Sequence, residues 1–124
     1  MSLDRFDALK EGLSASTRRV FASEDLQEWC DLCQLDQTWQ GVPEPLIAGL
    51  FSYLLGEELP GHGTNYLKQA MAFHATAEAG ETLTASVTIS RLRRDKALAN
   101  LKTVCTGHDG RLICDGEALV LFQH

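Results

Sequence analysis

A chain of 124 residues with 44% hydrophobic content is long enough for one hydrophobic core and too short for two, so we expect one domain over residues 1–124. The net charge of −6, from 17 acidic and 11 basic residues, argues against a nucleic-acid or anionic-membrane partner, because both attract basic proteins. No run of 18 apolar residues and no signal peptide are visible, so we expect a cytoplasmic location.

The first third of the chain predicts an arm, a short strand and a helix. Residues 1–15 mix apolar and charged side chains and are expected to pack over the domain as an arm. Residues 16–22 are typical of an edge strand. Ser23 suits the N-cap of a helix that ends near Leu35, since acidic residues follow in its first turn. The predicted buried face of this helix is Leu26, Trp29, Cys30 and Cys33.

The four cysteines were weighed as a metal site, a redox pair or core residues. Cys30 and Cys33 form a C-x-x-C pair, but Cys105 and Cys114 are nine residues apart on predicted strands, whereas a zinc site needs a second close pair. We therefore predict no metal site and four reduced thiols, with Cys30 and Cys33 buried as small hydrophobic residues.

The most hydrophobic stretch runs from Pro45 to Gly56 and predicts a central helix. Pro45 suits the first helical position, where its missing N–H costs nothing, and Gly56 suits the position just past the end. Apart from Ser52 and the Tyr53 hydroxyl the stretch has no polar face, so we expect the rest of the protein to cover it on nearly every side. A loop over residues 36–44 leads into this helix.

From Thr64 onward the hydrophobic period changes to two, which predicts strands. A first strand has Leu67, Met71 and Phe73 as its candidate inward residues. The next three are expected over residues 81–90, 97–106 and 111–122, with turns at residues 93–96 and at the Asp109-Gly110 pair, a strong hairpin signal.

Strands joined by such short turns are antiparallel neighbours. The sequence therefore predicts an α+β fold, in which a strongly curved antiparallel sheet of about five strands wraps around one long apolar helix. The exposed edges of such a sheet would invite aggregation, so we also expect a homodimer that pairs through sheet edges.

Several segments of the chain resemble the MaoC-like, (R)-specific enoyl-CoA hydratase family. The resemblance is carried by residues 54–56, 59–69, 80–84, 95–96, 109–110 and 116–118. It implies the hot-dog fold, and a dimer that binds an acyl thioester of coenzyme A or of acyl carrier protein at the subunit interface. It implies no cofactor beyond that thioester.

The loop that carries this family's chemistry is incomplete here. The family pattern Asp-x-Asn-Pro-x-His supplies the groups that activate water and protonate the α-carbon. Asp36 can be laid on its Asp, but Asn, Pro and His then fall on Thr38, Trp39 and Gly41. The His-Gly pair that follows in the family falls on Pro43-Glu44. The remaining histidines are expected at the surface rather than as bases: His62, His74, His108 and His124.

Two carboxylates are the candidate catalytic groups, Asp36 and Glu44. Some hot-dog thioesterases place a carboxylate at this helix as nucleophile or general base, which is one interpretation of Glu44. The other is an acid near the helix N-terminus that the helix dipole stabilises without any function.

The candidate ligand-binding residues are Ser52, Gly61, Gly63, Arg94 and Lys96. Ser52 matches a serine of the family's helix and is a candidate lining residue. Arg94 and Lys96, with Arg91 and Arg93, could contact the phosphates of coenzyme A, although a solvated hairpin turn explains them equally well. The sequence thus predicts an acyl-thioester protein with impaired or altered hydratase chemistry. A thioesterase and a non-catalytic binding protein stay open as alternatives.

Overall fold

The computed structural model describes residues 8–33 and 41–122 of the chain. Their helices and strands follow one another along the chain as β1 (Ser14–Val20), α1 (Ser23–Cys33), α2 (Glu44–Tyr53), a π-helical turn (Leu54–Glu58), β2 (Thr64–Phe73), β3 (Thr82–Arg93), a 3₁₀ turn (Arg94–Lys96), β4 (Leu98–Thr106) and β5 (Leu112–Phe122).

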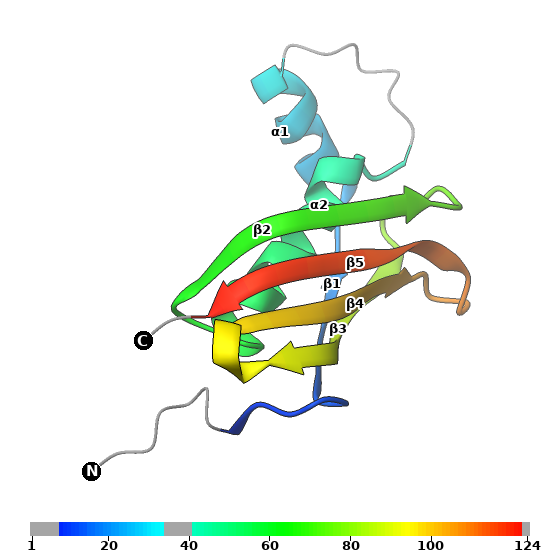
Figure 1. Cartoon of the computed structure of the whole chain (residues 1–124). Helices are drawn as coiled ribbons and strands as arrows, with labels where there is room; N and C mark the ends of the chain where they lie inside the picture. Colours follow the sequence, from blue (N-terminus) through cyan, green and yellow to red (C-terminus); the bar gives the residue numbers. More distant parts are fainter. Residues whose placement is uncertain (1–7, 34–40, 123–124) are drawn as a thin grey trace.

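The strands form one antiparallel sheet in the order β1-β3-β4-β5-β2, and the sheet curves around α2 (Figure 1). This confirms the predicted α+β hot-dog architecture. β1 lies at one edge, as predicted, and β2 at the other. The Asp109-Gly110 turn joins β4 to β5: Gly110 N–H donates to Gly107 O at 3.0 Å, and the φ of Gly110 is 82°.

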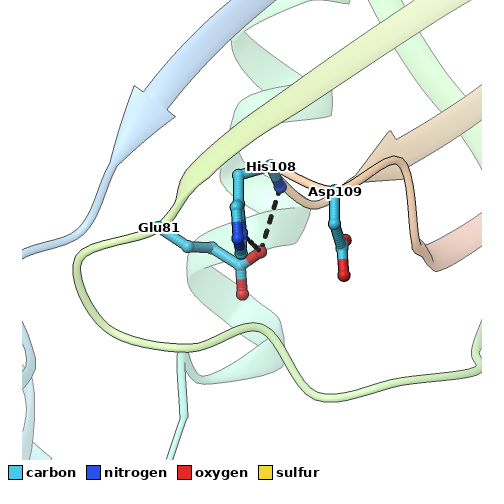
Figure 2. Close-up of side chains that lie close together, drawn as sticks. All are labelled: Glu81, His108 and Asp109. Atoms are coloured by element: carbon cyan, nitrogen blue, oxygen red, sulfur yellow. Dashed lines mark hydrogen bonds and ion pairs between the residues drawn. The ribbon is translucent and has the colours of Figure 1, made fainter.

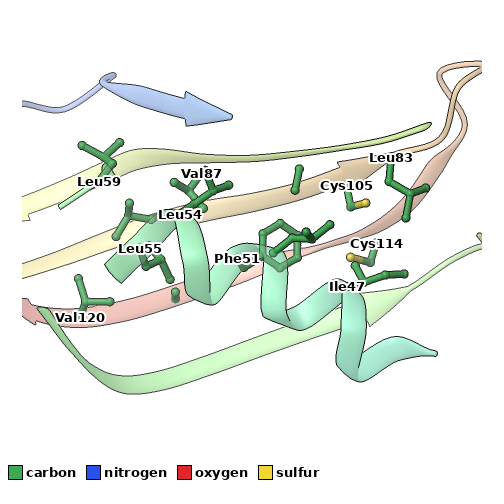
Figure 3. Close-up of a cluster of buried hydrophobic side chains, with 14 of the residues drawn as sticks. Ile47, Phe51, Leu54, Leu55, Leu59, Leu83, Val87, Cys105, Cys114 and Val120 are labelled. Carbon is green, nitrogen blue, oxygen red and sulfur yellow. The ribbon is translucent and has the colours of Figure 1, made fainter. Parts of the chain in front are cut away.

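The hydrophobic core lies between α2 and the concave face of the sheet. Phe51, Leu54 and Leu55 are completely buried, and Figure 3 shows them among side chains of the strands. The predicted inward set of β3 is confirmed, since its four members are buried: Leu83, Ala85, Val87 and Ile89.

The prediction that α2 is covered on nearly every side is wrong within a single chain. Pro45, Gly49, Ser52 and Tyr53 form an exposed side of the helix, and Tyr53 is 51% exposed. A lone helix with one sheet can bury only the side that faces the sheet, so the apolar composition alone overstated its coverage.

Two predicted inward residues point to solvent. Leu67 is 51% exposed because β2 pairs with β5 through Tyr66 and Lys68 and carries Leu67 as an irregularity between them, which takes it out of the alternation. Cys33 is also exposed, at the last position of α1, whereas Cys30 one turn earlier is buried. The two strand cysteines are buried free thiols, as predicted. None of the described helices is long and apolar enough to cross a membrane.

Candidate functional site

The start of α2 presents one backbone donor between two prolines. Pro43 and Pro45 have no N–H, and the N–H of Leu46 donates to Pro43 O at 3.0 Å. That leaves the N–H of Glu44, and no side chain of the described residues caps this helix end. Because the positive end of the helix dipole lies here, the Glu44 N–H is placed to bind a carbonyl oxygen or an anion.

The segment before Glu44 is held against the connector between β2 and β3. The Val42 N–H donates to Ala77 O at 2.7 Å, and both residues are buried. Gly41 has a φ of +84°, and a Cβ there would lie only 2.9 Å from Ala77 O. Sequence analysis missed this contact, although the loop glycine beside the helix start was the available signal for a close backbone approach.

The buried side of the helix start packs over two thiols. Cys105 and Cys114 are paired across β4 and β5, and Figure 3 shows Cys114 beside Ile47. The hydrogen bond with Cys105 and burial both raise the pKa of the Cys114 thiol, and the nearby Asp115 and Glu44 carboxylates add to this. Cys114 is therefore a protonated core residue rather than a nucleophile.

Ser52 lies on the exposed side of α2, two turns after Glu44. It hydrogen-bonds the hydroxyl of Tyr66 on β2, whose pKa is raised by burial despite that bond. This pair links the open side of the helix to the edge strand, and Ser52 is about 12 Å along the helix axis from Glu44. Sequence analysis did not find the Tyr66 contact, because nothing in the spacing ties a helix residue to a strand residue 14 positions later.

The other candidate binding residues gather at the far end of α2. The N–H of Gly61 donates to Leu55 O at 3.0 Å and helps to close the helix end, and Gly63 follows in the same connector. Arg94 donates to the backbone oxygen of Leu9, and Lys96 is exposed in the same 3₁₀ turn. The turn lies at the opposite end of β3 from the connector that holds Val42, roughly 30 Å away at 3.3 Å per residue. Within one chain, these residues are therefore not brought together with Glu44.

The comparisons with known proteins agree with this architecture. An (R)-specific enoyl-CoA hydratase of Rhodospirillum rubrum is 32% identical over 134 aligned residues, which cover 96% of this chain and 92% of that protein. The chain belongs to the (R)-specific enoyl-CoA hydratase family. The solved (R)-hydratase of Aeromonas caviae superposes with a TM-score of 0.84 at 32% identity, over 94% of this chain and 98% of that one. An (R)-hydratase of Pseudomonas aeruginosa gives 0.85 at 24% identity, over 96% and 85%. No family model matches the chain.

Measured against the resemblance to the enoyl-CoA hydratase family, the helix start of this chain lacks a described histidine. His62 pairs with Glu57 at 2.9 Å, His74 with Asp115 at 2.8 Å, and His108 with Glu81 at 3.0 Å. The prediction that these three lie at the surface is confirmed, and each has its own carboxylate partner away from Glu44. Asp36 and His124 lie outside the described residues.

Proposed function

We propose that this enoyl-CoA hydratase relative binds an acyl thioester of coenzyme A or acyl carrier protein with its carbonyl at the start of α2, and that its hydratase chemistry is impaired. The observation that carries the proposal is the Glu44 N–H, a single uncapped donor between Pro43 and Pro45. A donor fixed before the substrate arrives stabilises the negative charge that develops on a thioester oxygen.

Hydration needs two further groups, one to activate water and one to protonate the α-carbon. The three described histidines are engaged elsewhere, and Glu44 is the exposed carboxylate at this point of the chain. Polarisation without a complete acid/base pair binds the thioester and leaves the hydration step slow. No cofactor is part of this proposal.

Thioester hydrolysis is the second candidate function. It is favoured by the Glu44 carboxylate, which follows directly from the same residue whose N–H faces the ligand. A carboxylate there would activate water or attack the polarised carbonyl, and no α-carbon protonation is required.

We further propose that the protein acts as a homodimer and that β2 is the edge that pairs. β2 is exposed over most of its length and carries Tyr66 and Leu67, at 39% and 51% exposure, beside the open side of α2. β1 instead carries Arg18 and Arg19, charges that discourage edge pairing. Sedimentation equilibrium at micromolar concentration should give twice the chain mass of 13.7 kDa. Leu67→Lys should shift the equilibrium to monomer and Val20→Lys should not; a monomeric wild type would remove this proposal.

The deciding experiment is to incubate the purified dimer separately with crotonyl-CoA and butyryl-CoA and identify the products by mass spectrometry. Stoichiometric binding with crotonyl-CoA recovered mostly intact is expected. Rapid hydration of crotonyl-CoA would refute the impairment, hydrolysis of either compound would favour the thioesterase, and failure to bind either would overturn the proposal.

A further inference from the structure

A buried carboxylate lies at the start of β3, on the side of the molecule where α2 begins. The Glu81 side chain is only 4% exposed and accepts hydrogen bonds from the Glu78 N–H at 2.7 Å, the His108 N–H at 3.1 Å and His108 Nδ1 at 3.0 Å. Arg111 Nη2 donates a fourth at 2.7 Å. Figure 2 shows Glu81 and His108 in contact, with Asp109 beside them. A buried charge with this many donors is fixed in place.

Burial alone would raise the pKa of Glu81, but the hydrogen bonds from Glu78, His108 and Arg111 lower it to about 2. The carboxylate is therefore ionised at neutral pH. Glu81, His108 and Asp109 also lie close enough together to suggest a cation site. The Arg111 guanidinium already fills the cation position, since it contacts both Glu81 and Asp109, at 2.7 and 3.0 Å.

Arg111 connects this cluster to a second loop. While Nη2 pairs with Glu81, it also donates to the backbone oxygen of Thr76 at 3.1 Å. Thr76 and Ala77 belong to the connector between β2 and β3, so one guanidinium joins that connector to the β4–β5 hairpin. A planar fork of donors can make these bonds together, which a lysine ammonium cannot.

The same connector holds the start of α2. Ala77 O accepts the Val42 N–H at 2.7 Å, and Thr76 and Ala77 lie against Gly41 without room for a Cβ. Two residues separate Val42 from Glu44, and Pro43 restricts the backbone between them. A displacement of Thr76-Ala77 must therefore move the Glu44 N–H.

We propose that Glu81 and Arg111 are positioning residues, which fix the Thr76-Ala77 segment and through it the Glu44 N–H that binds the thioester carbonyl. This rests on the proposed function for the role of Glu44 and on hydrogen bonds alone for the positioning. Neither residue touches the ligand.

The test compares Arg111→Lys with Asp109→Asn. Lysine keeps the charge and loses the fork, whereas Asp109→Asn alters the outer partner of Arg111 and leaves its bonds to Glu81 and Thr76 untouched. Two ligands are used, butyryl-CoA and its thioether analogue S-butyl-CoA, which lacks the carbonyl oxygen. The ratio of their Kd values reports the contact with Glu44 N–H, and a general folding defect would weaken both ligands equally.

Arg111→Lys should reduce the preference for butyryl-CoA about fivefold, the size of one lost hydrogen bond, and should speed hydrogen exchange at the Val42 amide by a similar factor. Asp109→Asn should change neither. If Arg111→Lys does not fold, Glu81→Gln, which keeps the side-chain shape, should give the same two changes.

Wild-type preference and Val42 protection that persist in both Arg111→Lys and Glu81→Gln would overturn the positioning role. A wild type that binds butyryl-CoA no better than its thioether would instead overturn the role of Glu44. In that case Val42 exchange in the unliganded variants alone decides whether the Glu81–Arg111 pair holds the segment.

Discussion

At its start α2 follows Val42 and Pro43, is tied to the β2–β3 connector by one hydrogen bond to Ala77, and leaves the Glu44 N–H uncapped. At its far end the chain tightens into the π-helical turn, where the N–H groups of Leu59 and Gly61 are bonded to Leu54 O and Leu55 O. The far end therefore satisfies its backbone groups within the chain. The start keeps one donor for a ligand.

Burial differs between the two ends in the same sense. Leu54, Leu55 and Leu59 at the far end are buried, whereas Glu44 and Pro45 at the start are exposed. The difference teaches that stability and chemistry are separated along a single helix. Substitutions at the far end should change the free energy of unfolding, and those at the start should change what happens to the ligand.

The largest expected effect concerns the missing base at the start. Hydration of crotonyl-CoA should be about 10² to 10⁴ times slower than by the related (R)-hydratase of Aeromonas caviae, because loss of one acid/base group typically costs that much. The decay of the conjugated enoyl absorbance measures it, with the relative assayed in parallel. A turnover on the order of 10 s⁻¹ would mean that a residue outside this comparison supplies the proton.

Glu44→Gln tests whether the start carries the thioesterase chemistry. Any acyl-CoA hydrolysis should fall about 10²-fold, because the amide cannot act as a base or nucleophile, while the free energy of unfolding changes by only about 0.3 to 1 kcal/mol. Release of free thiol from butyryl-CoA is the measurement. Glu58→Gln, at the far end, is the control. Undiminished hydrolysis in Glu44→Gln would exclude the carboxylate mechanism at this position.

Leu55→Ala should be the strongest substitution at the far end. Leu55 is completely buried, and truncation leaves a cavity that costs about 2 to 5 kcal/mol in urea unfolding. The Kd ratio of butyryl-CoA to S-butyl-CoA should not change. Glu58→Ala, exposed in the same turn, should stay within about 0.5 kcal/mol of wild type. A changed Kd ratio in Leu55→Ala would break the separation of the two ends.

Acid should loosen the start through Glu81. Its folded pKa of about 2 lies below the ordinary value of 4.5, so its contribution to stability is present above 4.5 and is lost as the pH falls toward 2. His108 acts in the opposite sense: its hydrogen bond to Glu81 raises its pKa, so its contribution is lost as the pH rises through that pKa. Urea titrations of wild type and Glu81→Gln between pH 5 and 2 should converge. A constant difference between them would contradict the stated role of the charge.

Local patterns were enough to predict most elements of the fold. The alternation from Leu83 to Ile89, the Asp109-Gly110 turn and the proline at the start of the central helix each depend on neighbours within a few residues, and the structure has all three. The position of Glu44 at a helix start was predictable for the same reason.

Contacts between distant segments had to come from the tertiary structure. Leu67 leaves the core because of its register with β5, α2 keeps an open side because one sheet covers only one face, and Val42 meets Ala77 across 35 residues of chain. Arg111 looks like a hairpin charge in the sequence, and only the folded chain brings it to both Glu81 and Thr76. Periodicity and turn signals fix which face a residue takes within its own element. Which other element meets that face is decided by packing, and packing depends on the whole chain.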